Sequence, residues 1–133
     1  MANSRYKLGW EKFLTGSIDV TSATIKCLLV KSAYTPNFTT HEFISDLGAN
    51  ILSRVTLSSK TATLGTFDAA DATFTAVAGG DQGTYLVIAK DTGSDATSPL
   101  IGAIDTGSGL PITTNGGDIT VQWSNGTDKI FTL

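Results

Sequence analysis

Cysteine, histidine and methionine each occur only once in this chain of 133 residues. Cys27 has no second cysteine with which to form an intramolecular disulfide, and one histidine leaves too few thiolate or imidazole ligands for a zinc site. Composition alone therefore argues against disulfide-rich and zinc-dependent classes. We expect Cys27 to act as a small core hydrophobe, because no partner base or second cysteine activates its thiol.

Long hydrophobic runs are missing as well. No segment approaches the roughly 18 apolar residues of a membrane helix, and the opening MANSRYKLGW lacks the apolar core of a signal peptide. We therefore expect a soluble chain that has no membrane partner.

Basic residues are scarce and unevenly placed. Residues 1–60 carry seven basic and four acidic side chains, whereas residues 61–133 carry two basic and eight acidic ones, for a net charge of −3. Such asymmetry could let copies pack through complementary patches, although aspartates that serve turns are the simpler explanation. Without a Lys/Arg cluster to contact phosphates, we expect no nucleic-acid partner.

Threonine, serine and glycine dominate what is present, with 21, 12 and 14 copies. This composition predicts strands joined by turns. We predict an all-β, single-domain antiparallel β-sandwich over residues 1–133, with one or two short helices. The expected later strands are ILSRVTLS, TATLGTF, ATFTAV, TYLVIAK, PLIGAID, GDITVQWS and KIFTL.

The N-terminal segment RYKLGWEKFLTG predicts a short helix that ends at Gly16 and is capped at Asn3 or Ser4. Gly9 within it lowers helix stability by up to about 1 kcal/mol relative to alanine, so we expect the helix to depend on docking its aromatic face. That face carries Tyr6, Trp10, Phe13 and Leu14 at helical spacing.

From Ser17 the hydrophobic period changes to two, and SIDV followed by TIKCLLVKS reads as strand. Both faces of the second segment are mostly apolar. We predict a central strand, covered by a second sheet on one side and by the N-terminal helix or a neighbouring subunit on the other. Ile25, Cys27 and Leu29 form one face, and Lys26, Leu28 and Val30 form the other.

The stretch after this strand, from Tyr34 to Asn37, predicts a Pro-Asn turn, and a helix is expected over about residues 40–47. Thr39 and Glu42 have the spacing of a capping box at its start. The only histidine, His41, falls in the first turn of this helix, where we expect a structural or solvent-facing role because no second metal-ligating or catalytic group accompanies it.

The pair Asn125–Gly126, between ITVQWS and KIFTL, is the strongest hairpin signal in the sequence. Both central positions of a type I′ turn require a positive φ, which asparagine and glycine tolerate. We therefore predict that the last two strands pair antiparallel.

Catalytic patterns are weak throughout. No G-x-S-x-G elbow occurs, the glycine-rich turns lack a phosphate-binding context, and most of the ten aspartates lie beside turn residues. Oxygens of the run Asp91–Asp95, or of Asp68 and Asp71, could join a calcium site, but neither matches a calcium-loop spacing. Trp10 and Trp123 could stack on sugars, although core packing is favoured for both. We predict no enzyme, no catalytic residue, no metal and no cofactor.

The ordered motifs GSIDVTSATIKCLLVKSAYTPNFTTHEFISDL, TLGTFDAADATFTAV, LVIAKDTG, SPLIGAIDTGSGLPITTNGGDITVQW and GTDKIFTL span about residues 8–133. Together they resemble small virion structural proteins of tailed bacteriophages. The resemblance consists of landmarks and carries no catalytic signature. These landmarks are Tyr34-Thr35-Pro36-Asn37, Ser98-Pro99-Leu100 and Gly116-Gly117-Asp118.

The resemblance implies a capsid decoration or cement protein that stabilises the head by binding across junctions between copies of the major capsid protein. A homo-oligomer, trimer or dimer, is expected, in the virion and, during assembly, in the host cytoplasm. A tail, spike or fibre component that binds tail proteins or a host-surface glycan is the alternative, and a secreted carbohydrate-binding module is a third. The expected interface residues are Tyr6, Trp10, Phe13, Tyr34, Thr35, Pro36 and Asn37.

Overall fold

The computed structural model describes residues 4–105, 109–123 and 130–132 of the chain. In these ranges the fold is mostly β, with antiparallel sheets and two short helices. The all-β prediction is confirmed at this level.

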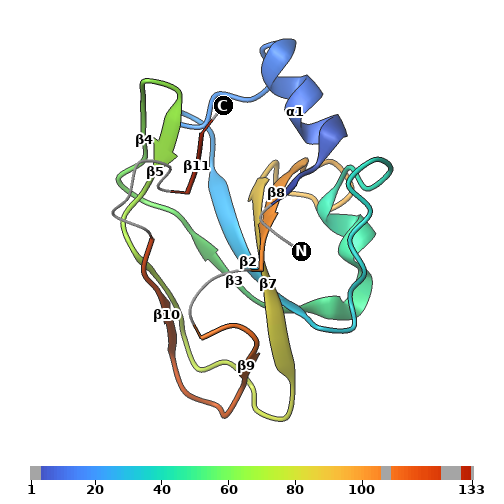
Figure 1. Ribbon diagram of the computed structural model, residues 1–133, viewed down its shortest axis with the longest axis vertical. Coiled ribbons are helices and arrows are strands. Elements are labelled where there is room, and N and C mark those ends of the chain that lie inside the picture. Colours follow the sequence, from blue (N-terminus) through green and yellow to red (C-terminus); the bar gives the residue numbers. More distant parts are fainter. Residues whose placement is uncertain (1–3, 106–108, 124–129, 133) are drawn as a thin grey trace.

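The largest sheet has the strand order β1-β8-β7-β2-β3, and β9 pairs separately with β7 (Figure 1). Two smaller sheets lie beside it: β10 pairs with β6, and β5 lies between β11 and β4. The strands are β1 (Ser4–Arg5), β2 (Ile25–Lys31), β3 (Ile51–Thr56), β4 (Thr61–Thr63), β5 (Thr66–Asp68), β6 (Ala72–Phe74), β7 (Gln82–Lys90), β8 (Leu100–Ile104), β9 (Ile112–Thr113), β10 (Ile119–Val121) and β11 (Phe131–Thr132).

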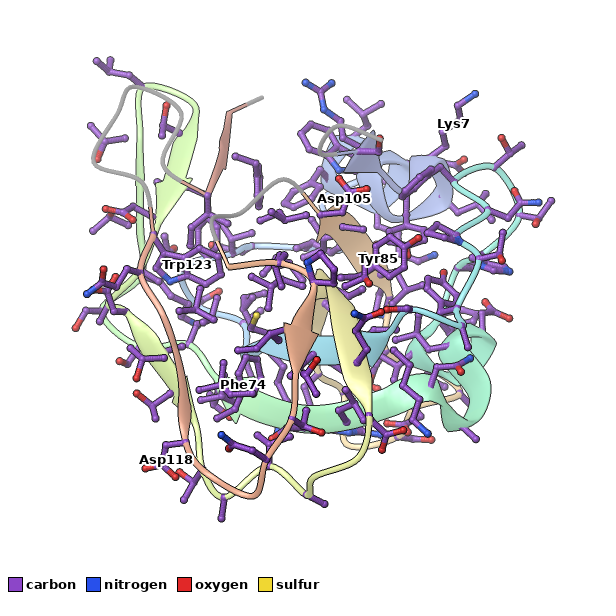
Figure 2. All side chains as sticks on the ribbon, turned by 60° about the horizontal axis from the view of Figure 1, so that its bottom comes forward. Lys7, Phe74, Tyr85, Asp105, Asp118 and Trp123 are labelled. Atoms are coloured by element: carbon purple, nitrogen blue, oxygen red, sulfur yellow. The ribbon has the colours of Figure 1, made fainter. Side chains whose placement is uncertain are left out.

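The predicted central strand is confirmed, because β2 lies between β7 and β3 and both of its faces are buried. One face joins a hydrophobic cluster that includes Phe67, Phe74 and Trp123. Phe74 and Trp123 lie on the side of the smaller sheets (Figure 2). The other face joins a second cluster, with Tyr6, Ile44 and Leu47. Cys27 is fully buried in the first cluster, and burial raises the pKa of its thiol. Its expected role as a core hydrophobe is confirmed.

The predicted N-terminal helix is present as α1 (Lys7–Leu14), but its expected cap is wrong. Ser4 belongs to β1, where it pairs with Ala103, and Asn3 lies outside the described residues. The cap position is Tyr6, which makes no side-chain cap hydrogen bond. The backbone N–H of Lys7 instead donates to the carbonyl of Phe38 at 2.8 Å, so tertiary contact replaces local capping.

The glycine inside α1 is explained by close packing. A Cβ on Gly9 would lie 1.7 Å from the backbone oxygen of Leu100 at the start of β8. Two residues that flank Gly9 in sequence hold the helix in place: the Tyr6 backbone N–H and the Trp10 indole N–H donate to the carbonyl of Ile101 at 3.0 and 2.9 Å. The helix thus depends on docking, as expected, and only glycine allows the approach.

The helix predicted at about residues 40–47 is confirmed only over its second half and is of a different type. The structure has a 3-10 helix, η1 (Ile44–Asn50), interrupted by Gly48 at a φ of 63°. Thr39 and Glu42 do not form the expected capping box. The Asp46 carboxylate accepts hydrogen bonds from the backbone N–H groups of Glu42 and Phe43 at 2.8 and 2.9 Å, and so displaces the start of the helix by several residues.

Three strand predictions are also wrong. The segment TATLGTF is not one strand, because a turn at Leu64 and Gly65 separates β4 from β5. The segment SIDV forms no strand but a turn, in which the Asp19 carboxylate accepts from the backbone N–H of Thr21. The last two strands do not pair with each other, because β10 pairs with β6 and β11 pairs with β5. The predicted turn at Asn125–Gly126 lies outside the described residues.

The Asp46 cap gives a test of the loop between β2 and β3. Asp46→Ala should lower the free energy of unfolding by about 1 kcal/mol at pH 7, whereas Asp46→Asn, which keeps an acceptor, should lose less. The hydrogen bonds from Phe43 and Glu42 hold the pKa of Asp46 below the usual aspartate value. The stabilisation is therefore complete above about pH 4 and is lost as the pH falls through the lower, folded-state pKa. Urea unfolding at pH 7 and at pH 3 measures both effects, and a pH-independent difference between wild type and Asp46→Ala would contradict the assignment.

Candidate functional site

An apolar groove lies between the end of α1 and the β4–β5 hairpin. Its volume is about 390 Å³. Both elements lie at the same end of the molecule (Figure 1). Among the described lining residues only Asp19 is charged. The lining residues are Phe13, Gly16, Ile18, Asp19, Val20, Ala62, Gly65, Thr66, Phe67 and Phe131.

The floor of the groove is one row of side chains across the three-stranded sheet. Phe131 of β11 is paired with Phe67 of β5, and Phe67 is paired with Ala62 of β4. Residues that pair directly across strands share a face of the sheet, so all three side chains belong to the same surface. The side chains of this row become smaller from Phe131 and Phe67 to Ala62 at the outer strand of this sheet.

Aromatic packing fixes the wall that α1 contributes. The Phe13 and Phe131 rings are 6.3 Å apart at 65°, and the Trp10 ring lies 5.6 Å from both. The guanidinium of Arg5 lies 4.3 Å from the centre of the Trp10 ring. These aromatic pairs and the cation–π contact hold Phe13 at the groove, where its ring is only partly buried.

Two exposed leucines adjoin the groove. Leu14 ends α1 next to Phe13 and is 89% exposed, and Leu64 lies at the hairpin tip next to Gly65 and is 97% exposed. In the described part of the chain, no other large hydrophobic side chain is exposed to this degree. A single exposed leucine is ordinary, but two that are sequence neighbours of groove-lining residues favour an interaction surface at this end of the molecule.

Leu64 also has an unfavourable backbone conformation. Its φ is 52°, and the following Gly65 has a φ of 78°, the signs required at both central positions of a type I′ turn. Glycine, asparagine and aspartate adopt this region readily, whereas other L-residues lose roughly 1–2 kcal/mol there. A fully exposed leucine in this position is therefore poor for stability, which favours a role in binding.

The Asp19 carboxylate gives one end of the groove a negative charge. Hydrogen bonds from the Thr21 hydroxyl and backbone, at 2.8 and 3.0 Å, lower the pKa of Asp19, with a further contribution from Ser22. The group is thus ionised at neutral pH. A partner with a basic side chain beside apolar ones would complement this end.

The expected interface residues do not form one surface. Phe13 lines the groove and Trp10 supports it, but Tyr6 and Tyr34 are 0% and 4% exposed and belong to the cluster on the opposite face of β2. Neither tyrosine can present its ring to a partner in this fold. Thr35, Pro36 and Asn37 lie in the loop on the other side of α1 from the hairpin (Figure 1).

His41 has a structural role in this second region, which agrees with the sequence prediction. Its Nδ1 atom lies 2.7 Å from the Tyr34 hydroxyl and accepts the backbone N–H of Asn37 at 3.2 Å. The Tyr34 hydroxyl is also 2.9 Å from that of Tyr6, and burial raises the pKa of both tyrosines. The chain of contacts ties the Pro-Asn turn to the start of α1.

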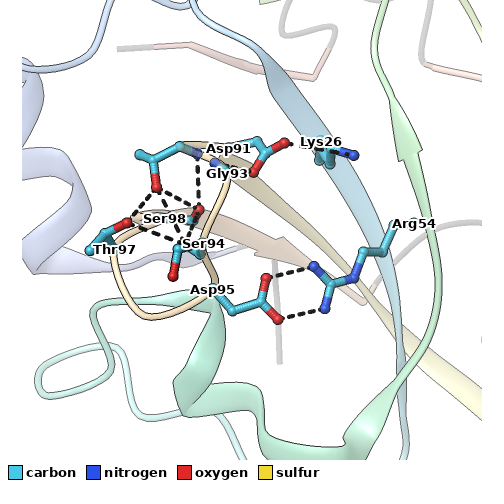
Figure 3. A network of polar contacts seen from close by, with 9 residues as sticks. Lys26, Arg54, Asp91, Gly93, Ser94, Asp95, Thr97 and Ser98 are labelled. Atoms are coloured by element: carbon cyan, nitrogen blue, oxygen red, sulfur yellow. Dashed lines mark hydrogen bonds and ion pairs between the residues drawn. The ribbon is translucent and has the colours of Figure 1, made fainter.

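Three of the four aspartates weighed as calcium ligands make local structural contacts, and Figure 3 shows two of them, Asp91 and Asp95. Both Asp95 carboxylate oxygens accept hydrogen bonds from Arg54 at 2.7 Å, and this pair lowers the pKa of Asp95. Asp91 accepts the backbone N–H of Gly93 and lies 3.7 Å from the Lys26 ammonium. Asp71 accepts the backbone N–H of Trp123 at 3.0 Å. Over residues 4–105, 109–123 and 130–132, no group of three or more His, Cys, Asp or Glu side chains is arranged to hold a metal ion.

Trp123 is buried, at 8% exposure, and its indole N–H donates to the carbonyl of Ala70 at 3.1 Å, so the core assignment is confirmed for this residue. Trp10 is partly buried in the aromatic wall of the groove. Neither ring is presented as an open stacking platform for a sugar. No helix in the described part of the chain has the length and apolar character needed to cross a membrane.

No protein-family model matches this chain, and no curated protein matches its sequence.

Proposed function

We propose that this chain is a non-catalytic structural protein of a tailed-bacteriophage virion, a decoration protein that binds the assembled capsid through the apolar groove and its two leucines. The observation that carries the binding role is Leu64, which is 97% exposed at a φ of 52° beside an apolar groove. The phage setting comes from the resemblance of the sequence to small virion proteins.

We further propose that the sheets form a β-sandwich. In support, one hydrophobic cluster combines residues of β2, β7 and β8 with residues of β5 and β6, as expected when sheets pack face to face. Such a core holds the hairpin and the end of α1 in fixed positions. A rigid surface of this kind loses little conformational entropy when it binds.

A protein partner suits the charges better than a nucleic acid does. Four basic side chains are already engaged with carboxylates: Lys12 with Glu42, Lys26 with Asp91, Lys31 with Asp81 and Arg54 with Asp95. The groove itself carries a negative charge at Asp19. Phosphate binding depends on unengaged, clustered cations, so this surface favours an apolar protein contact.

The mechanism would be mass action. A protein that binds the assembled shell and not its free subunits lowers the free energy of the shell by an amount that grows with occupancy. Repetition across equivalent subunit junctions multiplies a modest contact into a large total. In this mechanism no covalent bond is made or broken.

Copy number tests this function directly. Quantitative mass spectrometry of purified virions should find hundreds of copies of this protein for each particle, and particles produced without it should rupture at lower temperature. A handful of copies per virion would overturn the decoration role and would favour the tail or fibre alternative.

A further inference from the structure

The outer edge of β4 is the second notable feature of this end of the molecule. β4 is the last strand in the order β11-β5-β4, and in the described part of the chain no strand pairs with its other side. All three of its residues are exposed. An exposed edge of this kind is a template for pairing with another strand.

The hairpin geometry determines which backbone groups point outwards. Thr63 and Thr66 flank the two-residue turn and face each other, so they form its closing hydrogen-bonded pair. Hydrogen-bonded and non-hydrogen-bonded pairs alternate along an antiparallel ladder, which makes Ala62 and Phe67 the non-bonded pair. The N–H and C=O of Ala62 therefore point away from β5, towards the open edge.

The same residue joins the edge to the groove. The Ala62 side chain ends the row that begins with Phe131 and Phe67, and it lines the groove. A strand added to β4 would place a side chain opposite Ala62 on this face. Because Ala62 is small, a large apolar side chain could lean across it onto Phe67.

The size of the groove bears on whether a second copy of this chain or a single extended segment binds there. Ten described residues line the groove, whereas stable interfaces between folded proteins use about 20–30 residues on each side. A second copy of this chain would need further contacts outside the groove, Leu14 and Leu64 to form a stable dimer. A single extended segment needs less area, because main-chain hydrogen bonds supply part of its affinity.

We propose that the apolar groove and the open edge of β4 bind one extended segment of a partner protein, which adds to β4 as a further strand and places a large apolar side chain over Ala62. A basic residue near one end of the segment pairs with Asp19. This inference rests on the proposed function only for the identity of the partner, which would then be a capsid protein.

The test uses peptides and the intact protein, and no virion. A yeast-displayed library of random decapeptides is selected on the wild-type chain, and the affinity of the enriched peptides is measured by fluorescence anisotropy. We expect enriched sequences that alternate large apolar and polar residues and carry a lysine or arginine. Enrichment of helical i, i+3, i+4 spacing, or of no peptide at all, would overturn the proposal.

The variant Ala62→Pro removes the outward N–H and no hydrogen bond to β5, so the edge strand should tolerate it. We expect it to weaken peptide affinity at least tenfold, while the matched Ala62→Ser stays within about threefold of wild type. Ala62→Trp, which fills the groove side of this exposed position, should weaken binding as well if the proline variant does not fold. Equal affinity of all three variants would contradict strand addition.

Analytical sedimentation tests the remaining possible occupant of the β4 edge, which is a second copy of this chain. A wild-type oligomer that Ala62→Pro dissociates would show that a second copy fills the edge, and would overturn the proposed partner segment. Because peptide binding needs no virion, a low copy number on particles would refute the decoration role without refuting the groove as a strand-binding site.

Discussion

Gly9→Ala should lower the free energy of unfolding by roughly 2–4 kcal/mol, although alanine ordinarily stabilises a helix interior by about 1 kcal/mol relative to glycine. The new Cβ would lie 1.7 Å from the Leu100 backbone oxygen and 2.9 Å from its carbonyl carbon. The backbone of Leu100 cannot move aside as the end of a flexible side chain can. Leu100 is held by its pairing with Ala89 and by its N–H, which donates to the Glu42 carbonyl at 2.8 Å.

The helix must therefore move, and the bonds that dock it must weaken. The Tyr6 N–H and the Trp10 indole both donate to Ile101, so displacement of α1 strains both contacts. Urea unfolding followed by circular dichroism measures the loss. Glu11→Ala, at an exposed position of the same helix, is the control and should change stability by less than about 0.5 kcal/mol. A Gly9→Ala protein as stable as wild type would show that α1 is not docked in this way.

The double variant Leu14→Gln/Leu64→Asn should bind particles produced without the protein at least a hundredfold more weakly than wild type does. The two leucines are the most exposed large hydrophobic side chains of the described residues, and fully burying a leucine contributes about 1.5–3 kcal/mol. Affinity is measured by co-sedimentation of purified protein with these particles at a series of concentrations.

Stability should change in the opposite direction. Asparagine tolerates the positive φ of position 64 better than leucine does, so Leu64→Asn alone should raise the free energy of unfolding by about 1 kcal/mol. Weaker binding in a more stable protein cannot be attributed to misfolding. Lys7→Gln, exposed at the other end of α1, is the binding control and should retain wild-type affinity. Undiminished binding of the double variant would place the interface elsewhere.

The sequence predicted those elements whose signal is local. β2 was predictable because a strand buried on both faces must be apolar at consecutive positions, as it is at Cys27, Leu28 and Leu29. The aromatic stripe likewise predicted α1. The predicted start of the helix at about residues 40–47 was wrong because the Asp46 carboxylate, four residues after Glu42, accepts the backbone N–H that the Thr39 cap would have used.

Local sequence patterns could not predict which distant strands pair with each other. β10 and β11 adjoin in sequence, yet each pairs with a strand more than 40 residues earlier. The groove has the same origin, since Phe13, Phe67 and Phe131 meet only in the folded chain. One signal was available: in TATLGTF, the two-residue turn holds Leu64 where a type I′ turn prefers asparagine or glycine. This unfavourable turn residue is the one feature of the sequence that singles out Leu64.

Hydrogen–deuterium exchange of the free and the particle-bound protein tests the central claim most directly. Binding through the apolar groove predicts slower exchange over residues 13–20 and 61–67, with the strongest effect at the outward-facing amide of Ala62, and little change over residues 34–37. Protection confined to residues 34–37 or 91–98, with the hairpin exchanging as in the free protein, would contradict it.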